Sequence, residues 1–258
     1  MASPLIALLT DFGTADWYVA CMKAVILSRC PTARLIDITH EVPPRDITAG
    51  AFILAAAAPW FPPQTVFACV VDPGVGTRRA LIAARADRHF LVGPDNGLLS
   101  LVFQRAKHVS LVRLTHPRDW LPAVSQTFQG RDIIAPVAAH LAHRRSLQRL
   151  GASMTTYQTL RFPPPQRKSK VLEGRVLHID AFGNLITNFP AHPTTKSSPR
   201  QFRYHGARIR LVSSYQEGRA GELIALAGST GYVELAIRNN SAAIRCRAKR
   251  GDRVQWVL

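Results

Sequence analysis

One acidic residue, Asp72, ends an apolar stretch and is followed at once by two glycines in the segment Asp72–Arg79 (DPGVGTRR). A carboxylate in that place can bind a ligand, and glycines let the backbone approach the ligand closely. The segment lacks the Gly-Lys-Ser/Thr ending of a phosphate-binding P-loop. A tight turn would explain the glycines, but it would not explain an acidic residue directly after the end of so apolar a strand. We therefore expect a ligand site here.

Two more acids, Asp11 and Asp16, share a loop that follows another apolar stretch. Acids at strand ends can hold the hydroxyl groups of a ribose. Asp16 has a simpler explanation as the N-cap of the next helix, whereas Asp11 has no such explanation. Asp11 is therefore the stronger candidate for a ligand contact.

Two further segments, Phe128–Asp132 and Asp180–Asn184, combine polar side chains with glycine. In the first, Asp132 can be explained as an N-cap with Arg131 as its ion-pair partner. The second can be explained as a β-turn, because asparagine and glycine favour turn positions. Neither segment is specific by itself.

Grouped metal ligands are missing from the sequence. The nine histidines are scattered, and none of the four cysteines belongs to a C-x-x-C pair. His140 and His143 are three residues apart on a predicted helix, but without nearby acids we expect both at the surface. We expect no metal and no redox cofactor.

The elements that must position these residues alternate between strand and helix. Apolar runs at 5–9 and 65–71 predict strands buried on both faces. The alternation predicts an α/β fold with a mostly parallel sheet, in which ligands bind at the carboxyl ends of strands. Asp11 and Asp72 both lie just beyond such ends. The predicted elements are strands at 5–9, 34–38, 65–71, 80–84, 89–92 and 108–114 and helices at 16–29, 46–58 and 132–147.

The character of the sequence changes at Phe162–Pro165, where three successive prolines predict a stiff, extended linker. Downstream, short strand-like segments between Gly, Asn and Ser turns predict a smaller all-β domain. We predict an α/β domain over 1–162, a linker over 163–170 and the all-β domain over 171–258. The predicted strands are 171–179, 186–188, 207–212, 222–226, 232–237 and 253–257, and the polar stretch 191–200 is expected to be a surface insertion.

The chain is strongly basic, with 33 Lys and Arg against 16 Asp and Glu among 258 residues. Its 47% apolar content excludes a disordered chain. A net charge of +17 favours contact with polyanions. However, the arginines are scattered, and no aromatic residues interleave with their clusters as in single-strand binding proteins. We therefore favour a solvated basic surface over nucleic acid as a partner.

Membrane insertion and export are also not favoured. The apolar run 5–9 is too short for a signal sequence, and prolines interrupt the longer uncharged stretch 47–71. We expect a cytoplasmic protein that does not contact a membrane.

Taken together, the segments resemble the S-adenosylmethionine (SAM) hydroxide adenosyltransferases, or SAM hydrolases, which are relatives of the fluorinases and chlorinases. The matching segments run in the same order from Leu9 to Ala243: 9–13 (LTDFG), 37–44 (DITHEVPP), 71–76 (VDPGVG), 93–97 (GPDNG), 130–132 (GRD), 180–184 (DAFGN), 231–232 (GY) and 241–242 (SA). The resemblance implies a SAM- and adenosine-binding α/β domain and a β-barrel-like C-terminal domain. It implies a homotrimer with SAM between the N-terminal domain of one subunit and the C-terminal domain of its neighbour. The implied reaction turns SAM and water into adenosine and L-methionine without a metal or cofactor.

The resemblance also implies roles for individual residues. Asp72 and Arg79 match two members of an Asp-Arg-His triad that positions the water. The implied substrate-binding residues are Asp11 for the ribose hydroxyls, Asp16, Asp180 and Ser229 for the methionine amine and carboxylate, Asn184 for an adenine hydrogen bond, Phe182 and Tyr215 for the faces of the adenine, and Phe128 beside them.

The third triad position departs from the pattern, because Gln129 stands where the family has histidine. Glutamine can donate and accept hydrogen bonds but cannot take a proton. In the implied reaction a neutral thioether leaves a sulfonium during in-line attack at C5′ of the ribose, so alignment dominates the barrier. A general base adds about 10²–10⁴-fold, and a carboxylate bonded to Arg79 anchors water better than it removes a proton.

We therefore expect a working but slower SAM hydrolase in which Gln129 orients the water. Two alternatives stay open: a protein that binds SAM or adenosine without turnover, and a basic nucleic-acid-binding module. Halide in place of water is a minor variant of the first hypothesis.

Overall fold

The computed structural model describes residues 3–143, 146–191 and 201–257. The predicted insertion at 191–200 lies almost wholly outside these residues, as does part of the predicted helix over 132–147. The chain divides into two compact units, unit 1 at Met1–Leu160 and unit 2 at Arg161–Leu258. Each unit is described by itself.

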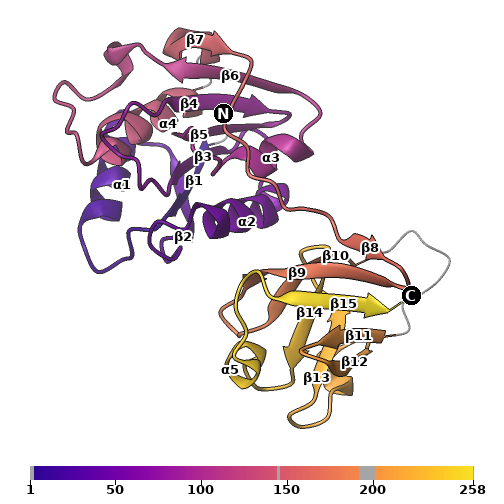
Figure 1. Cartoon of the computed structure of the whole chain (residues 1–258). Helices are drawn as coiled ribbons and strands as arrows, with labels where there is room; N and C mark the ends of the chain where they lie inside the picture. The colour runs from indigo at the N-terminus through magenta and orange to yellow at the C-terminus, as the bar shows by residue number, and fades with distance from the viewer. Residues whose placement is uncertain (1–2, 144–145, 192–200, 258) are drawn as a thin grey trace. The chain divides into compact units, whose positions relative to one another are not determined.

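Unit 1 is built on a sheet of seven described strands (Figure 1). The strands are β1 (Leu5–Thr10), β2 (Arg34–Thr39), β3 (Val66–Val70), β4 (Leu81–Ala86), β5 (His89–Pro94), β6 (Val109–Leu114) and β7 (Gly151–Met154). Their order is β2-β1-β3-β5-β4-β6-β7. β2, β1, β3 and β5 are parallel neighbours, β6 runs the same way, and β4 and β7 run the opposite way. The predicted mostly parallel sheet is confirmed.

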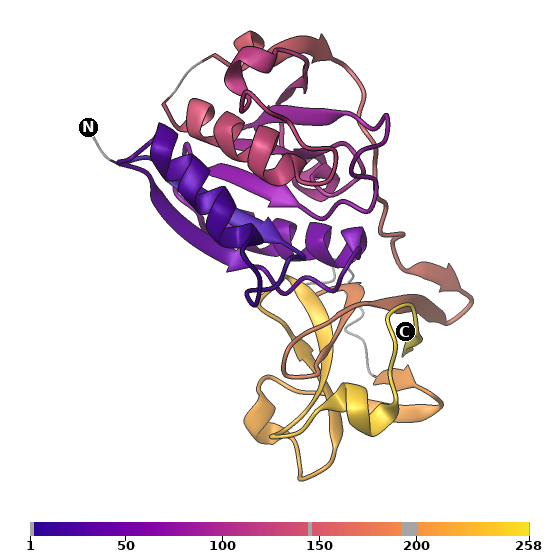
Figure 2. The ribbon, with the colours of Figure 1, turned by 90° about the vertical axis from the view of Figure 1, so that its left-hand side faces the viewer.

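Helices cover both faces of this sheet: α1 (Tyr18–Arg29), α2 (Ile47–Ala57), α3 (Ser100–Arg105) and α4 (Ala135–Ala142). Figure 2 shows α1 and α4 side by side over one face, and these two helices pack against each other. β1 shows why the strands are apolar throughout. Ile6 and Leu8 join the core under α1 and α4, whereas Ala7 and Leu9 join the core on the opposite face. The strand is therefore buried on both faces, as predicted.

Helix starts were predicted with mixed success. Asp46 caps α2, because its Oδ1 accepts the N–H of Ala49 at 2.9 Å. The predicted capping role of Asp16 is wrong: Trp17 is the N-cap residue of α1, and no side chain caps that end. Capping preference favours an acid such as Asp16 at the start of a helix, but the N-cap of α1 lies one residue further along the chain.

Two predictions near α4 are corrected by burial. Asp132 is fully buried inside the π-helical turn Gly130–Ile134, so it is not an N-cap. It does pair with Arg131, at 2.6 Å, as predicted. His140 is 8% exposed rather than a surface residue, and its Nδ1 lies 2.8 Å from Oδ1 of Asp119. The acid is Asp119, which lies in the segment between β6 and α4. This segment packs back against α4, so the acid comes from a part of the chain that is distant in sequence from His140.

Unit 2 is a β-barrel. Its elements are β8 (Gln166–Lys168), β9 (Val171–Ile179), β10 (Leu185–Pro190), β11 (Gln201–Tyr204), β12 (Ala207–Leu211), β13 (Leu223–Ala227), β14 (Tyr232–Ile237), α5 (Ala242–Cys246) and β15 (Arg253–Val257). The order β10-β14-β13-β12-β11-β15-β9 is closed by pairing of β9 with β10, which makes a barrel of seven described strands. The predicted barrel-like domain is confirmed.

The interior of the barrel is filled by aromatic and aliphatic side chains. Phe189, Phe202 and Trp256 are almost fully buried, and their ring centroids lie 5.3–5.6 Å apart. β8 pairs with the outer edge of β9 and lies within the stretch predicted as a linker. The sequence patterns also missed α3, α5, β7 and β11, because segments of four to six residues carry too little periodicity.

In the described ranges, no helix has both the length and the apolar character needed to cross a membrane.

Candidate functional site

Three residues predicted as catalytic form one connected network in unit 1. Asp72 follows β3, and Arg79 Nε lies 2.7 Å from each of its carboxylate oxygens. Arg79 Nη2 also pairs with Asp72 and donates to Oε1 of Gln129 at 2.6 Å. The side chains of Asp72 and Arg79 are only 5% and 11% exposed. This shielding strengthens the charge-assisted bonds between them.

The bond from Arg79 determines whether the oxygen or the nitrogen of the Gln129 side-chain amide is available to a ligand. A guanidinium has donors only, so the amide group that faces Arg79 must be the oxygen. The amide nitrogen is therefore the end that remains for a ligand. The side chain of Gln129 therefore offers a ligand N–H donors but no group that can take up a proton.

A cavity of about 320 Å³ opens beside this network. Asp11, Asp72 and Gln129 line it, and they follow or precede three separate elements: β1, β3 and the turn before α4. β1 and β3 are parallel neighbours, so their carboxyl ends meet at one edge of the sheet. The cavity thus lies at the strand ends where the sequence pattern predicts a ligand site.

Asp11 also shapes the cavity wall. Its Oδ2 accepts the backbone N–H of Arg45 at 2.7 Å. Arg45 lines the cavity in the left-handed region, with φ at 67°. A non-glycine residue persists there only when its surroundings hold it, and the bond that the N–H of Arg45 donates to Asp11 is one such restraint.

An aromatic cluster forms another wall. The Phe128 ring lies 5.9 Å from that of Phe12 and 5.1 Å from that of Tyr18, both edge-on. The Arg131 guanidinium lies 5.0 Å from the Phe128 ring centre. Phe128 is 7% exposed and lines the cavity, so the predicted contact residue has a fixed place there.

A polar chain that we did not single out supports the Asp11 loop, and it runs from buried Thr10 and His40 out to the more exposed Asp37 and Lys23. Thr10 Oγ1 lies 2.8 Å from Nδ1 of His40, and Nε2 of His40 lies 3.0 Å from Asp37. Lys23 donates to Asp37 at 2.6 Å. Burial acts in the opposite direction, but the contacts with Lys23 and His40 lower the pKa of Asp37. The pairing of β1 with β2 brings Thr10 beside His40 and Asp37, and α1 adds Lys23 from a separate element.

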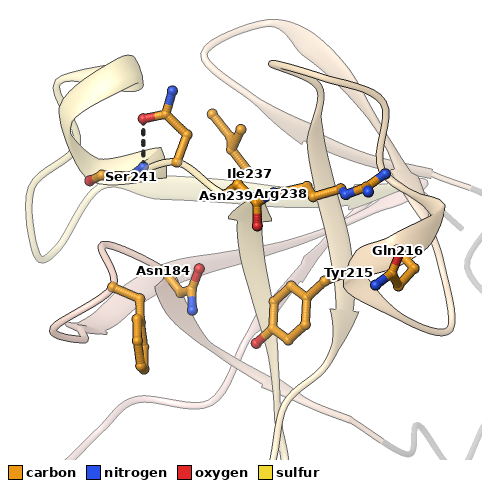
Figure 3. Close-up of a pocket in the computed structure, with 9 residues that line it drawn as sticks. Asn184, Tyr215, Gln216, Ile237, Arg238, Asn239 and Ser241 are labelled. Atoms are coloured by element: carbon orange, nitrogen blue, oxygen red, sulfur yellow. Dashed lines mark hydrogen bonds between the residues drawn. The ribbon is translucent and has the colours of Figure 1, made fainter.

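Unit 2 has its own cavity, of about 580 Å³. Phe182, Asn184, Tyr215 and Gln216 line it together with residues 237–241. Figure 3 shows Asn184 and Tyr215 on one side and the segment that carries Ile237 and Asn239 on the other. Phe182 is 79% exposed and Tyr215 is 44% exposed, so two aromatic surfaces are open to a planar ligand.

Asp180 organises the turn that presents Asn184. Its Oδ1 accepts the backbone N–H groups of Phe182 at 3.0 Å and Asn184 at 2.8 Å, and its Oδ2 accepts the Asn184 side-chain amide at 3.0 Å. Gly183 has a φ of 83°, and a Cβ there would lie 2.0 Å from Oγ of Ser241. The turn explanation therefore holds, and the turn also fixes the amide of Asn184.

A second buried contact fixes Tyr215. Its hydroxyl donates to Glu234, which is 6% exposed. Burial raises the pKa of Glu234; the bond from Tyr215 opposes this shift, and the charge of Asp180 adds to it. Burial together with this bond raises the pKa of Tyr215 as well. Glu234 was not identified from the sequence as a site residue. Its carboxylate meets Tyr215, 19 residues away in sequence, only because the strands of the barrel curve around to bring the two together.

Two predicted contact residues, Asp16 and Ser229, are exposed and line neither cavity. Their roles remain predictions. Among the described residues, no three His, Cys, Asp or Glu side chains are grouped so that they could hold a metal.

The fold and both cavities define a two-domain protein with a strand-end site in an α/β unit and an aromatic site on a barrel. The N-terminal domain of the SAM hydroxide adenosyltransferases matches residues 6–151, and their C-terminal domain matches residues 174–255. The chain belongs to this family.

Similar proteins cover nearly the whole chain. It is 40% identical to an (R)-S-adenosyl-L-methionine hydrolase of Salinispora tropica, with 98% of this chain and 97% of that protein covered. It is 36% identical to one of Thermus thermophilus, with 94% and 95% covered. A crystal structure of an uncharacterised conserved protein from Thermotoga maritima matches with a TM-score of 0.90 at 32% identity, over 98% of this chain and 100% of that one.

Proposed function

We propose that the protein hydrolyses S-adenosyl-L-methionine to adenosine and L-methionine, and that it acts on the R epimer at the sulfonium. The observation that carries this proposal is the Asp72–Arg79–Gln129 network beside Asp11, in a chain matched along its length by proteins named (R)-S-adenosyl-L-methionine hydrolase. The enzyme class follows from the same relatives.

The chemistry needs alignment more than activation. The water oxygen forms a bond to C5′ of the ribose while the bond from C5′ to sulfur breaks. The electron pair stays on sulfur, which becomes the neutral thioether of methionine, and one water proton passes to solvent. Because the leaving group is already activated, holding the water in line supplies most of the acceleration.

In this proposal the cavity of unit 1 holds the reacting end of the substrate. Asp11 holds the ribose hydroxyls, and Phe128 packs against the nucleoside. The amide N–H group of Gln129 donates to the water oxygen, while Asp72, kept in place by Arg79, accepts one of its hydrogens. The exposed rings of Phe182 and Tyr215 take the adenine, and Asn184 bonds to its edge. Asp16, Asp180 and Ser229 hold the methionine amine and carboxylate.

The oligomer and compartment are parts of the same proposal. Each unit offers only some of the groups that the substrate needs, which supports a homotrimer whose sites combine an N-terminal domain with the C-terminal domain of a neighbouring subunit. We also propose that the enzyme acts in the cytoplasm and that it needs no cofactor.

The test is incubation of the purified protein with each SAM epimer in water enriched in ¹⁸O, followed by mass spectrometry. We expect adenosine that carries the label at O5′, equimolar methionine, and faster turnover of the R epimer. The control is Asp72→Asn, which keeps the size of the side chain but weakens the hydrogen bond that residue 72 accepts from the water. Tight binding of SAM by calorimetry without adenosine above the control level would instead support a binding protein without turnover.

A further inference from the structure

The outer surface of the barrel concentrates the arginines that are scattered in the sequence. β12, β11, β15 and β9 are consecutive neighbours around the barrel (Figure 1). Along each strand the side chains alternate, so Phe202, Ile209 and Trp256 point inward and are buried. The residues between them point outward. We call one set of outward basic residues the arginine face: Lys168, Arg175, Arg203, Arg208, Arg210 and Arg253.

The strand register places like charges directly opposite one another. Arg203 on β11 is paired with Arg208 on β12. Arg253 on β15 is paired with Arg175 on β9. Like charges in directly opposed positions destabilise a sheet. The arginine face therefore contains two cross-strand repulsions.

Acidic neighbours compensate only part of this charge. Glu222 pairs with Arg210 at 3.1 Å. Glu173 lies 3.2 Å from both Lys168 and Arg253, so two cations share a single acid. No acid within the described residues pairs with Arg203 or Arg208, and Nε of Arg203 is buried without a hydrogen-bond partner. The two guanidinium charges at the centre of the arginine face therefore have no acidic partner among the described residues; Nε of Arg203 is itself buried, so a ligand would meet the outer end of that guanidinium.

We propose that the arginine face binds the phosphodiester backbone of nucleic acid, without regard to base sequence. Guanidinium groups bind phosphate through two parallel hydrogen bonds. Adjacent strands are about 4.8 Å apart, so arginines on four neighbouring strands reach several phosphates rather than one. A chain of linked phosphates matches that arrangement better than a single free anion.

The polar character of the face argues against a lipid surface. The outward residues of the two middle strands include Gln201 and Gln255 beside Arg203 and Arg253. Surfaces that bind membranes combine basic residues with several large apolar side chains that enter the bilayer. On these two strands the outward residues are two glutamines, two arginines and a single partly exposed valine, Val257. The sequence expectation of a merely solvated basic surface treated the arginines as scattered, whereas the register aligns them. This inference stands independently of the proposed hydrolysis.

The test uses the full chain and fluorescence anisotropy with a labelled 20-nucleotide RNA and a 20-base-pair DNA duplex at 50 and 200 mM NaCl. Four phosphate contacts predict an affinity loss of roughly 50- to 150-fold between the two salt concentrations. The double variant Arg203→Gln, Arg208→Gln should lower the slope of log affinity against log salt by about 1.4–1.8. Its Tm should not fall, because a repulsion is relieved.

The matched control is Arg113→Gln, Arg118→Gln, which removes the same charge from exposed positions of unit 1. It should leave the slope nearly unchanged. An equal loss in both double variants would assign the binding to overall charge and overturn the proposal. So would the absence of binding at 50 mM salt, or tighter binding to phosphatidylserine vesicles that is lost in the Arg203, Arg208 variant.

Discussion

Gln129 is the residue in which this chain departs from the pattern it otherwise follows. Its amide oxygen is taken by Arg79, and its amide nitrogen cannot accept a proton. The residue can therefore orient a water molecule but cannot activate it. The rate should reflect alignment alone, and it should show no step from a titrating base between pH 6 and pH 8.

Replacing Gln129 with histidine tests this argument. We expect Gln129→His to raise the rate of adenosine formation by about 10- to 100-fold, below the full benefit of a general base. A histidine acts as a base only when neutral, so the gain should appear as pH rises through about 6.5. Rates measured from pH 5.5 to 8.5 check both points.

The matching control is Gln129→Met, which removes both hydrogen-bonding ends at similar length. It should be slower than the wild type while SAM affinity, measured by calorimetry, changes little. Equal rates for the glutamine, histidine and methionine forms would contradict a role for this position in orienting water.

At the scale of elements, the ends of strands decide where polar groups gather. Asp11 and Asp72 follow β1 and β3, which are neighbours, and the turn before α4 adds Gln129 to the same edge. In the barrel, the turn after β9 presents Asn184, and β14 contributes Glu234 as the anchor of Tyr215. Rigid strands thus position most of these side chains, and in the proposed site the short turns supply the residues that contact the ligand.

Glu234 on β14 predicts a pH effect on stability. Because the pKa of this acid is raised in the folded state, the folded chain holds its proton more tightly than the unfolded chain does. The contribution of Glu234 to the free energy of unfolding is therefore fully present below the unfolded pKa of about 4.5. It is lost as pH rises through the folded value.

The variant Glu234→Gln keeps an acceptor for the Tyr215 hydroxyl and removes the buried charge. We expect its Tm at pH 7 to exceed that of the wild type by on the order of a few degrees, and the difference to shrink toward pH 4. Calorimetric scans at both pH values check this. A Tm gap that is the same at pH 4 and pH 7 would show that the charge is not the cause.

At the scale of the whole molecule, two compact units each hold part of the proposed site. Unit 1 presents the network of Asp72, and unit 2 presents the aromatic cavity beside Asn184. The proposed trimer joins these parts from different subunits. Light scattering should then give a mass of about 85 kDa, three times the 28.4 kDa of one chain.

Complementation tests the shared site directly. We expect Asp72→Asn and Asn184→Ala homotrimers each to be at least about 10-fold slower than the wild type. After mixing, unfolding and refolding together, the mixture should recover part of the activity, because some sites would combine two intact halves. A mixture no faster than the average of its components would place each site within one subunit.

The sequence by itself determined the class of fold, and it identified the segments that carry the proposed site. Continuous apolar runs indicate strands that are buried on both faces, as in a parallel sheet. The polar residues at the ends of these runs can be identified from the neighbouring sequence alone. The departure at Gln129 was equally visible. The fold prediction succeeded because periodicity and residue type are properties of neighbouring residues in the chain, whereas the roles of the site residues stay predictions.

Tertiary structure alone decided the rest. Asp119 reaches His140, His40 reaches Thr10, and Glu234 reaches Tyr215 only after distant segments pack together. The alignment of the arginines on the barrel depends on strand register, which composition does not encode. Pairing between residues that are far apart in sequence follows from the closure of sheets and barrels, so no local pattern could have specified it.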